Sequence, residues 1–236
     1  MSHAINVQKR DFGKSLYLLP CMIFVVLLTL RNSDSYGYLF ELLPVLGRTL
    51  PYFCLSLLLL GVFIYRGGSL TLIGMCWPKI DKTKFAIIRW ILLSALAILA
   101  LRVFIAVASG PLLELLPPKI SRTTPLTGNL SLLVTLLPVM WLVVIGEEVM
   151  FRGLVMNFLA KIFGDTTTAW LFAIVISAMI FGLGHIGKDP AAMISSGLGG
   201  LIYGLGYFLF KKNLWPVILA HCAGNTIGFV GAYFDD

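Results

Sequence analysis

The sequence predicts an all-α membrane protein, a polytopic bundle of about seven transmembrane helices. Hydrophobic residues make up 58% of the 236 residues and charged residues only 12%, whereas soluble domains average about 25% charged residues. The mean hydropathy is +0.93. Apolar runs of spanning length alternate with short polar loops, which are too short to form a separate water-soluble core. We therefore expect a single membrane domain over residues 1–236.

Seven apolar runs are long enough, or nearly so, to cross a bilayer as helices. The first follows Lys9, Arg10 and Lys14 and looks like a signal peptide, but no small-residue cleavage site follows it. We therefore interpret it as an uncleaved span. The fourth run is the longest, and a break near Gly153 is expected to leave 154–163 as a separate or interfacial segment. The predicted spans cover residues 16–30, 49–65, 85–107, 131–159, 169–186, 191–210 and 214–233.

The basic residues favour one orientation in the membrane. With the N-terminus inside, most loop Lys and Arg residues lie on the inner side, as the positive-inside rule requires. The net charge of +7 is thus explained by a lipid bilayer and not by a nucleic-acid partner. Arg89 and Arg102 are expected near the ends of the third span, where long side chains can reach lipid head groups. The inner set is Lys9, Arg10, Lys14, Arg66, Lys79, Lys82, Lys84, Lys161, Lys211 and Lys212; the outer set is chiefly Arg31, Lys119, Arg122 and Lys188.

Several smaller patterns predict structure and not chemistry. The four cysteines form no CxxC pair, so neither a disulfide framework nor a thiolate zinc site is indicated. Asp165 precedes "TTTAW" and is expected to cap a helix. The sixth span is rich in glycine, and Gly200 and Gly204 form a small-xxx-small step that allows two helices to approach closely.

Three charged residues interrupt the fourth span, in "WLVVIGEEVMFRGLVM". At the centre of a membrane helix each such charge costs about 2.5–3.5 kcal/mol, whereas a Leu, Ile or Val returns about 0.3–0.6 kcal/mol. Glu148 and Arg152 are four residues apart, the spacing of an intrahelical ion pair that supports the site. Glu147 must point elsewhere and is a candidate functional residue. A protonated Glu147 that donates a hydrogen bond inside the bundle is the alternative.

Two histidines lie in later spans with a partner one helical turn away. "FGLGH" places Phe181 and His185 on one face of the fifth helix, and "HCAGN" places His221 and Asn225 on one face of the seventh. A single histidine of this kind is usually a hydrogen-bonded core residue. Together with Glu147, however, the two histidines and Asn225 form a constellation that helix lengths allow to converge within the bilayer.

This constellation is suited to peptide-bond hydrolysis. Glu147, helped by an imidazole, can take a proton from water and so produce a nucleophile. Asn225 and a second histidine can donate hydrogen bonds to the oxyanion that forms when water attacks an amide carbonyl. Glu147, His185 and His221 are also a credible zinc set that leaves one position open for water. The residues alone therefore leave a zinc mechanism and a metal-free glutamate mechanism open.

The motifs "EEVMFR", "FGLGH" and "HCAGN" resemble, in order and spacing, the three motifs of the CPBP family. This is the CAAX protease and bacteriocin-processing (Abi) group of intramembrane endopeptidases. The resemblance covers about residues 131–230. It implies that Glu147 activates water with help from His185, that His221 and Asn225 stabilise the oxyanion, and that Glu148 and Arg152 support the site. It also implies a membrane-associated or lipidated peptide or protein substrate, either a prenylated protein or a bacteriocin or signal peptide, and a bacterial plasma membrane.

Two other classes of function remain open. A proton-coupled transporter or an immunity protein would use Glu147 as a titrating site without proteolysis, although the two halves of the chain show no inverted repeat. A silent scaffold would instead bind another membrane protein through its glycine-rich sixth helix.

Overall fold

The computed structural model describes residues 46–78, 83–116, 126–185 and 190–234, and these residues form helices and connecting turns without a strand. The all-α prediction is confirmed for this part of the chain. The first predicted span, 16–30, lies outside the described residues. The elements are α4 (Leu46–Tyr65), α5 (Lys84–Leu113), α6 (Leu130–Glu148), η2 (Val149–Met156), α7 (Asn157–Ile162), α8 (Thr167–Leu183), α9 (Pro190–Leu209) and α10 (Leu214–Phe234).

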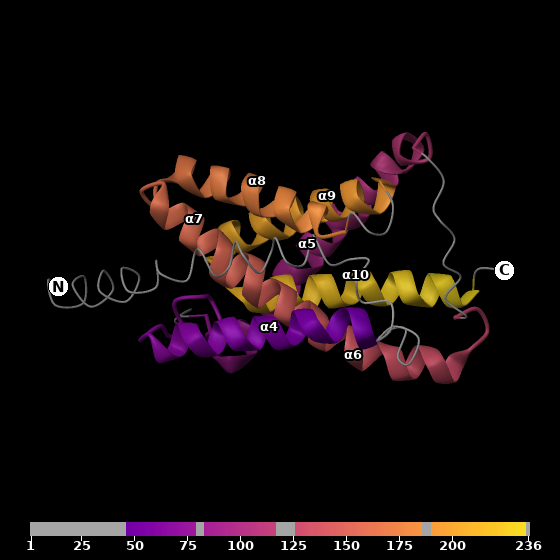
Figure 1. Cartoon of the computed structure of the whole chain (residues 1–236), viewed down its shortest axis with the longest axis horizontal. Coiled ribbons are helices and arrows are strands. Elements are labelled where there is room, and N and C mark those ends of the chain that lie inside the picture. Colours follow the sequence, from indigo (N-terminus) through magenta and orange to yellow (C-terminus); the bar gives the residue numbers. More distant parts are fainter. Residues whose placement is uncertain (1–45, 79–82, 117–125, 186–189, 235–236) are drawn as a thin grey trace, which may run out of the picture.

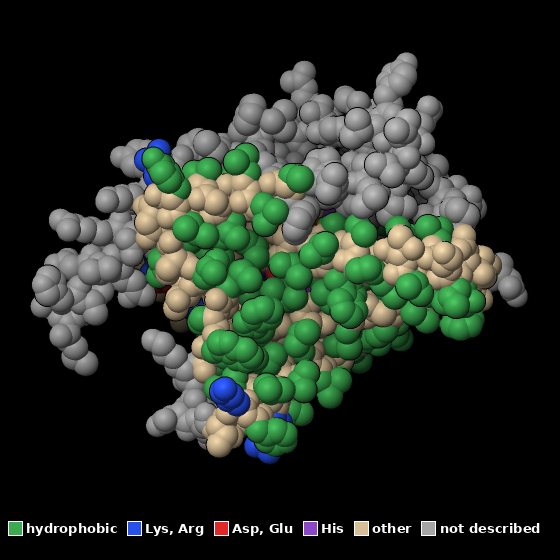
Figure 2. Space-filling model, turned by 90° about the horizontal axis from the view of Figure 1, so that it is seen from below, with side chains coloured by type: hydrophobic (Ala, Val, Ile, Leu, Met, Phe, Trp, Pro, Cys, Tyr) green, Lys and Arg blue, Asp and Glu red, His purple; other side chains and the backbone are tan. Residues whose placement is uncertain are grey.

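Four helical segments in the described ranges are long and apolar enough to cross a membrane: Lys84–Leu113, Leu130–Ile162, Pro190–Leu209 and Leu214–Phe234. Two shorter apolar helices accompany them, so the predicted number of about seven spans is not confirmed. Large apolar side chains face outward from these segments. Figure 2 shows one face covered with hydrophobic side chains, with Lys and Arg side chains at its margins. Such a surface is typical of an integral membrane protein.

The fourth predicted span is continuous, and the expected break near Gly153 is wrong. Helical residues run from Leu130 to Ile162, and Figure 1 shows α6 and α7 in one diagonal rod. The irregularity at this point is a π-helix, η2, whose wider turns leave backbone carbonyls misaligned. The Asn157 amide compensates, because its Nδ2 lies 2.8 Å from Arg152 O and 2.9 Å from Gly153 O. The chain therefore continues as a helix with a local change of pitch.

The rod crosses the centre of the bundle. Figure 1 shows α4 along the lower edge, α8 along the upper edge and α10 between them. The most extensive helix pair is α8 with α9, while α10 packs against both α5 and α6. The π segment η2 contacts α4, α8, α9 and α10. Side chains that η2 carries are therefore surrounded by four other helices, and all eight of its residues are buried.

Glycines bring α8 and α9 together, as the small-xxx-small step predicts. A Cβ atom at Gly200 would lie 3.0 Å from the Cα of Ala178, and one at Gly204 would lie 3.0 Å from the Cγ2 of Ile174. At Gly182 a Cβ would lie 2.9 Å from the carbonyl oxygen of Met193. Since backbone atoms cannot move aside without shifting a helix, a side chain at Gly182 or Gly200 would push α8 and α9 apart.

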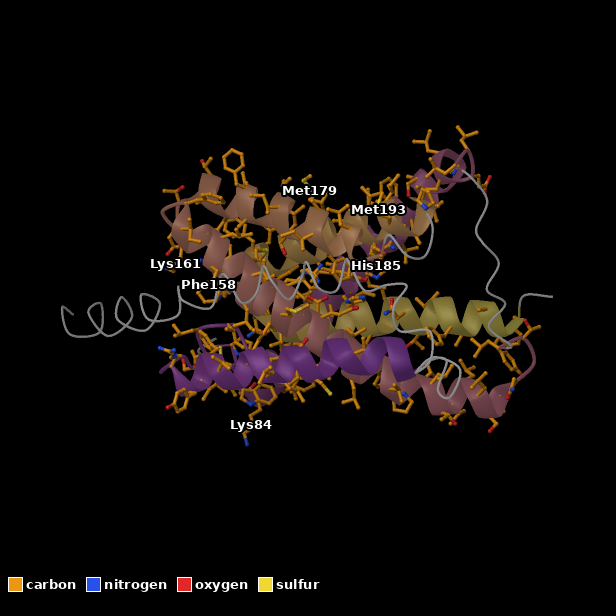
Figure 3. The ribbon with its side chains drawn as sticks, viewed as in Figure 1. Lys84, Phe158, Lys161, Met179, His185 and Met193 are labelled. Atoms are coloured by element: carbon orange, nitrogen blue, oxygen red, sulfur yellow. The ribbon has the colours of Figure 1, made fainter. Side chains whose placement is uncertain are left out.

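The connecting segments gather at two ends of the bundle. At one end, Leu214 N donates to Gly74 O at 3.0 Å, and Lys212 Nζ lies 3.9 Å from Asp165 Oδ1. Lys161 lies at the same end, because it pairs with Asp165 and Figure 3 labels it there, and Lys211 adjoins Lys212 in the chain. At the other end, Gly128 N donates to Tyr233 O at 3.0 Å. The structure thus brings together several of the basic residues that the charge pattern assigns to one side.

Asp165 does not cap α8, contrary to expectation. The cap is Thr166, whose hydroxyl accepts a hydrogen bond from Ala169 N at 3.1 Å. Asp165 itself adopts a positive φ of 57°, and its carboxylate accepts a hydrogen bond from Trp170 Nε1 at 2.8 Å and pairs with Lys161. Partial burial alone would raise the pKa of this carboxyl group, but the bonds from Lys161 and Trp170 outweigh burial and lower the pKa.

Candidate active site

Glu148 is the centre of a buried polar cluster. Its Oε1 accepts a hydrogen bond from Arg152 Nη1 at 2.8 Å and another from His221 Nδ1 at 2.6 Å. Glu148 is 0% exposed and Arg152 is 1% exposed. The i,i+4 ion pair is therefore as the spacing predicts, whereas the contact to His221, from α10, was not predicted. Among the described residues, the other carboxylate oxygen, Oε2, is buried without a hydrogen-bond partner.

Glu147 points away from Glu148, because successive residues of a helix are separated by about 100°. Its side chain is 19% exposed, so it is the more accessible of the two acids. Its Oε2 lies 3.9 Å from His221 Nε2, which is too long for a direct hydrogen bond and fits a bridging group such as water. The imidazole of His221 thus lies between the two glutamates, with Nδ1 toward the buried acid and Nε2 toward the accessible one.

Aromatic rings enclose this cluster. The Tyr203 ring of α9 stacks on His221 with centroids 4.5 Å apart and an interplanar angle of 24°. The Arg152 guanidinium lies 4.9 Å from the Phe181 ring and 5.4 Å from the Tyr203 ring, and its Nη2 donates to Gly200 O at 3.3 Å. Rings at these distances stabilise a cation and restrict the motion of an imidazole. Tyr203 was not predicted, since the glycine-rich pattern around it indicated packing alone.

His185 lies just beyond the end of α8, near His221. Its Nδ1 is 2.8 Å from the Phe181 carbonyl oxygen, and the Phe181 ring is 5.0 Å from the His185 ring and 6.1 Å from the His221 ring. Figure 3 shows His185 on the inner side of α8, whereas Met179 lies on its outer edge. Because a carbonyl oxygen can only accept, His185 Nδ1 carries a proton and Nε2 is the acceptor of the neutral ring.

Asn225 lies one helical turn beyond His221 on α10 and is half-buried. The structure therefore brings Glu147, Glu148, Arg152, Phe181 and His221 into one connected cluster, with His185 in contact with Phe181. Asn225 shares the helix of His221 and faces the same side by its i,i+4 spacing.

The His, Cys, Asp and Glu side chains in the described part of the chain do not form a metal-binding group. No three His, Cys, Asp or Glu residues there are arranged so that they could hold a metal ion. Glu147, His185 and His221, the predicted zinc ligands, are accordingly not gathered as a ligand set, and no step below depends on zinc. Both histidines of the site have Nδ1 beside an acceptor, Phe181 O for His185 and Glu148 Oε1 for His221.

The comparisons identify the segment that contains this cluster. Residues 129–227 match the family model of the Rce1-like proteins, described as type II CAAX prenyl endopeptidase. This segment matches the CPBP family. Comparisons with curated proteins and with solved structures gave no match. The resemblance drawn from the three motifs is confirmed. The family that this segment matches supports a protease of the CAAX type that acts within membranes. The segment begins at Asn129, the N-cap of α6, and ends two residues beyond Asn225.

Proposed function

We propose that the protein is an intramembrane endopeptidase that hydrolyses a peptide bond in a membrane-associated or lipidated peptide or protein. The observation that carries the proposal is the position of His221. Its Nδ1 is held by Glu148 at 2.6 Å while its Nε2 faces Glu147 at 3.9 Å, inside a segment of a protease family. One accessible acid and one oriented imidazole are the two groups that water activation and oxyanion stabilisation require.

In this proposal Glu147 is the general base. It takes a proton from a water molecule, whose oxygen then attacks the carbonyl carbon of the substrate. His185 assists, since its Nδ1 lies 2.8 Å from Phe181 O, and its Nε2, the acceptor of the neutral ring, would accept a hydrogen bond from the same water. Arg152 and Glu148 lie behind His221 and do not touch the substrate.

His221 and Asn225 stabilise the oxyanion. In the protonated imidazole both ring nitrogens are donors, so His221 can donate from Nε2 to the oxyanion while Nδ1 stays bonded to Glu148. The amide of Asn225 supplies a second donor one turn away. When the tetrahedral intermediate collapses, the C–N bond breaks, and the leaving nitrogen takes the proton that Glu147 had accepted. The carboxylate of Glu147 is thereby regenerated.

The exposed apolar surface supports a substrate that resides in or on the bilayer. The two substrate classes that we propose are prenylated C-terminal tails and bacteriocin or signal peptides, cleaved at a bacterial plasma membrane. The N-terminus faces the inside in this proposal, on the basis of the positive-inside rule.

A cleavage assay on purified full-length protein tests the proposal. The substrates are prenylated, unmodified and bacteriocin-like peptides, each with and without a chelator. Glu147→Gln should lower the cleavage rate by at least about 100-fold, the smallest loss typical of a general base, while the protein still accumulates in membranes. The matched control is Glu114→Gln, at an exposed carboxylate after the end of α5, and this variant should cleave normally.

The same assay separates the alternatives. Undiminished cleavage by Glu147→Gln would contradict the proposed base. Solute uptake or bacteriocin protection that persists in the absence of any cleavage would support the transporter or immunity interpretation instead. Loss of activity with chelator, restored by zinc, would support the zinc mechanism in place of the metal-free one.

A further inference from the structure

Asn157 of α7 and Tyr207 of α9 form a buried polar pair that takes no part in the proposed chemistry. Asn157 is 5% exposed and Tyr207 is 0% exposed. The Asn157 Nδ2 lies 2.8 Å from Tyr207 Oη, and this hydroxyl donates a hydrogen bond to Ile73 O at 3.2 Å. Replacing both members of a buried polar pair with apolar residues of the same shape can be nearly neutral for stability. Packing alone therefore does not explain why the bundle contains an amide and a phenol here.

The surroundings of Asn157 fix the orientation of its amide. Nδ2 lies 2.8 Å from Arg152 O and 2.9 Å from Gly153 O. Tyr207 Oη also accepts, because its own proton goes to Ile73 O. All three neighbours are thus acceptors, so the nitrogen of the amide faces them and not the oxygen. A leucine would fill the same space but would remove these donors from two carbonyl oxygens of the helix.

The two carbonyl oxygens belong to the turn in which η2 passes into α7. Arg152 lies five residues before Asn157 and Gly153 lies four residues before it, which are the hydrogen-bond spacings of a π-helix and of an α-helix. The Asn157 backbone N–H donates to Leu154 O, so the side chain supplies the donors that stabilise the wide turn. If this turn relaxed by one residue to α-helical pitch, the helix on one side would rotate by about 100° against the other.

The register of η2 determines which way Glu148 and Arg152 point. Arg152 lies within η2, and Glu148 immediately precedes it. In the observed register Arg152 Nη1 donates to Glu148 Oε1 at 2.8 Å, and Nη2 donates to Gly200 O of α9 at 3.3 Å. The same Glu148 oxygen lies 2.6 Å from His221 Nδ1 of α10. Because these partners lie on separate helices, a rotation at η2 would break at least one of the contacts.

The same polar pair is connected to the start of α10. Tyr207 Oη donates to Ile73 O, and Leu214 N donates to the next carbonyl oxygen, Gly74 O, at 3.0 Å. Leu214 begins α10, and His221 lies about two turns further along this helix. Ile73 and Gly74 lie outside the segment that the family model matches. Two successive peptide groups of the first half of the chain thus connect the turn at η2 with the helix that carries His221.

We infer that Asn157, braced by Tyr207, is a positioning residue that holds η2 in the register in which Glu148 meets both Arg152 and His221. It acts through these three side chains and not on the substrate. The inference rests on the proposed function for its effect on cleavage. The hydrogen bond between Glu148 and His221, however, forms without substrate and reports the register directly.

Nuclear magnetic resonance of the full-length protein in detergent, isotope-labelled at histidine, tests this inference. The proton in the 2.6 Å contact between His221 and Glu148 should give a signal far downfield, which His221→Gln identifies by its absence. Asn157→Leu should lose this signal. Asn157→Ser should lose it as well, because a helical serine donates to carbonyl oxygens three or four residues back and not to Arg152 O, five residues back.

Two controls accompany this measurement. The His185 ring, whose Nδ1 lies 2.8 Å from Phe181 O, is the internal reference, and its signal should not change. Ser177→Ala is the matched variant, since Ser177 Oγ donates to another carbonyl oxygen of η2, Phe151 O, at 3.4 Å but not at the turn that Asn157 holds. This variant should keep both histidine signals.

The cleavage assay gives a second measurement. Asn157→Leu should lower kcat by about 100-fold, the loss that a misplacement of about 1 Å can cause. KM should stay close to the wild-type value, because the surface that binds the peptide is unchanged. Ser177→Ala should cleave normally.

The outcomes separate this inference from the proposed function. Loss of the His221 signal in both Asn157 variants, with the His185 signal intact, supports the inference even if the wild-type protein cleaves no peptide. An unchanged His221 signal in Asn157→Leu overturns the inference and leaves the proposed endopeptidase intact. Loss of both histidine signals together, or failure of both variants to fold, overturns it too, because Asn157 would then stabilise the bundle as a whole.

Discussion

Glu147 and Glu148 are neighbours in the chain but have opposite surroundings. Glu148 is wholly buried between Arg152 and His221, whereas the Glu147 side chain remains 19% exposed and faces the other nitrogen of the same imidazole. A buried carboxylate must be paired to be tolerated, and an accessible one can exchange a proton with substrate water. The adjacent positions on one helix thus allow one acid to be structural and the other to be chemical.

Glu148→Gln should lower both stability and activity. The amide keeps the shape of the side chain but leaves the Arg152 charge buried without a counter-ion, so we expect a loss of about 3–5 kcal/mol in the free energy of unfolding. Thermal unfolding of the detergent-solubilised protein, followed by circular dichroism, measures this loss. The control is Glu114→Gln, and partial recovery is expected when Arg152→Met is added. Equal melting temperatures of Glu148→Gln and wild type would contradict the prediction.

Asp165→Asn should destabilise the protein at neutral pH and not in acid. The pKa of Asp165 in the folded protein lies below its ordinary value of 3.8, so the folded state favours the ionised carboxylate. This stabilisation is fully present above the unfolded pKa and disappears as the pH falls through the folded pKa. The difference in melting temperature between variant and wild type should thus shrink below pH 3.8. A difference that is constant from pH 7 to pH 3 would exclude this electrostatic cause.

At this scale the sequence predicts local contacts better than distant ones. The Glu148–Arg152 pair follows from a spacing of four residues on one helix. The contacts of His221 with Glu148 and Tyr203 join α10 to α6 and α9, and helix spacing carries no information on which faces of separate helices meet. Arg102 of α5 illustrates the same limit, because its Nη2 donates to Ser195 Oγ of α9 at 3.1 Å, and no spacing within α5 predicts a contact with another helix.

At the scale of the elements, hydrophobic runs predict where helices lie but not how their backbones deviate. The runs 85–107 and 131–159 correspond to helices that reach Leu113 and Ile162. The π segment η2 has no periodicity signal of its own. It is stabilised by Asn157, whose amide nitrogen lies 2.8 Å from both Arg152 O and Tyr207 Oη. The sequence does not show that a side chain such as Asn157 donates hydrogen bonds to the carbonyl oxygens of a π-helix. Only the positions of the neighbouring residues show it.

Gly200→Ala should destabilise the contact between α8 and α9. The added methyl group would lie 3.0 Å from the Cα and 3.2 Å from the Cβ of Ala178, so the helices must separate. Overpacking of this kind costs about 1–3 kcal/mol. Cleavage should fall as well, since Gly200 O accepts a hydrogen bond from Arg152. Melting temperature and cleavage rate are the measurements.

The control for this substitution is Gly228→Ala on α10, where nothing lies within 4 Å of an added Cβ. Alanine is the better helix former, and this variant should be as stable as the wild type or slightly more so. A Gly200→Ala protein with the stability of Gly228→Ala would show that the two helices are not in close contact.

At the scale of the whole molecule, the two ends of the bundle should face opposite sides of the membrane. Lys161 and Lys211 lie near the Asp165–Lys212 contact, and Thr127 lies beside Ala232 at the other end. In a variant without native cysteines, Lys161→Cys and Lys211→Cys should react with a membrane-impermeant maleimide only after cells are permeabilised. Thr127→Cys should react in intact cells. Labelling of all three under one condition would contradict both the fold and the positive-inside orientation.

Hydropathy alone predicts an all-α membrane bundle, because the cost of burying polar backbone in lipid allows few other solutions. The number of spans is less well predicted. Helices such as α8, with 17 residues, are near the lower limit for crossing a bilayer, and run length does not decide whether such a helix spans.

The position of the polar cluster among helices with apolar outer faces affects how the proposed enzyme would meet its substrate. A peptide dissolved in lipid diffuses in two dimensions, and its collision frequency depends on its mole fraction among the lipids and not on its amount per volume of buffer. Adding inert phospholipid at a fixed quantity of enzyme and peptide would therefore slow hydrolysis by surface dilution. The composition and area of the host membrane would then regulate turnover without any allosteric ligand.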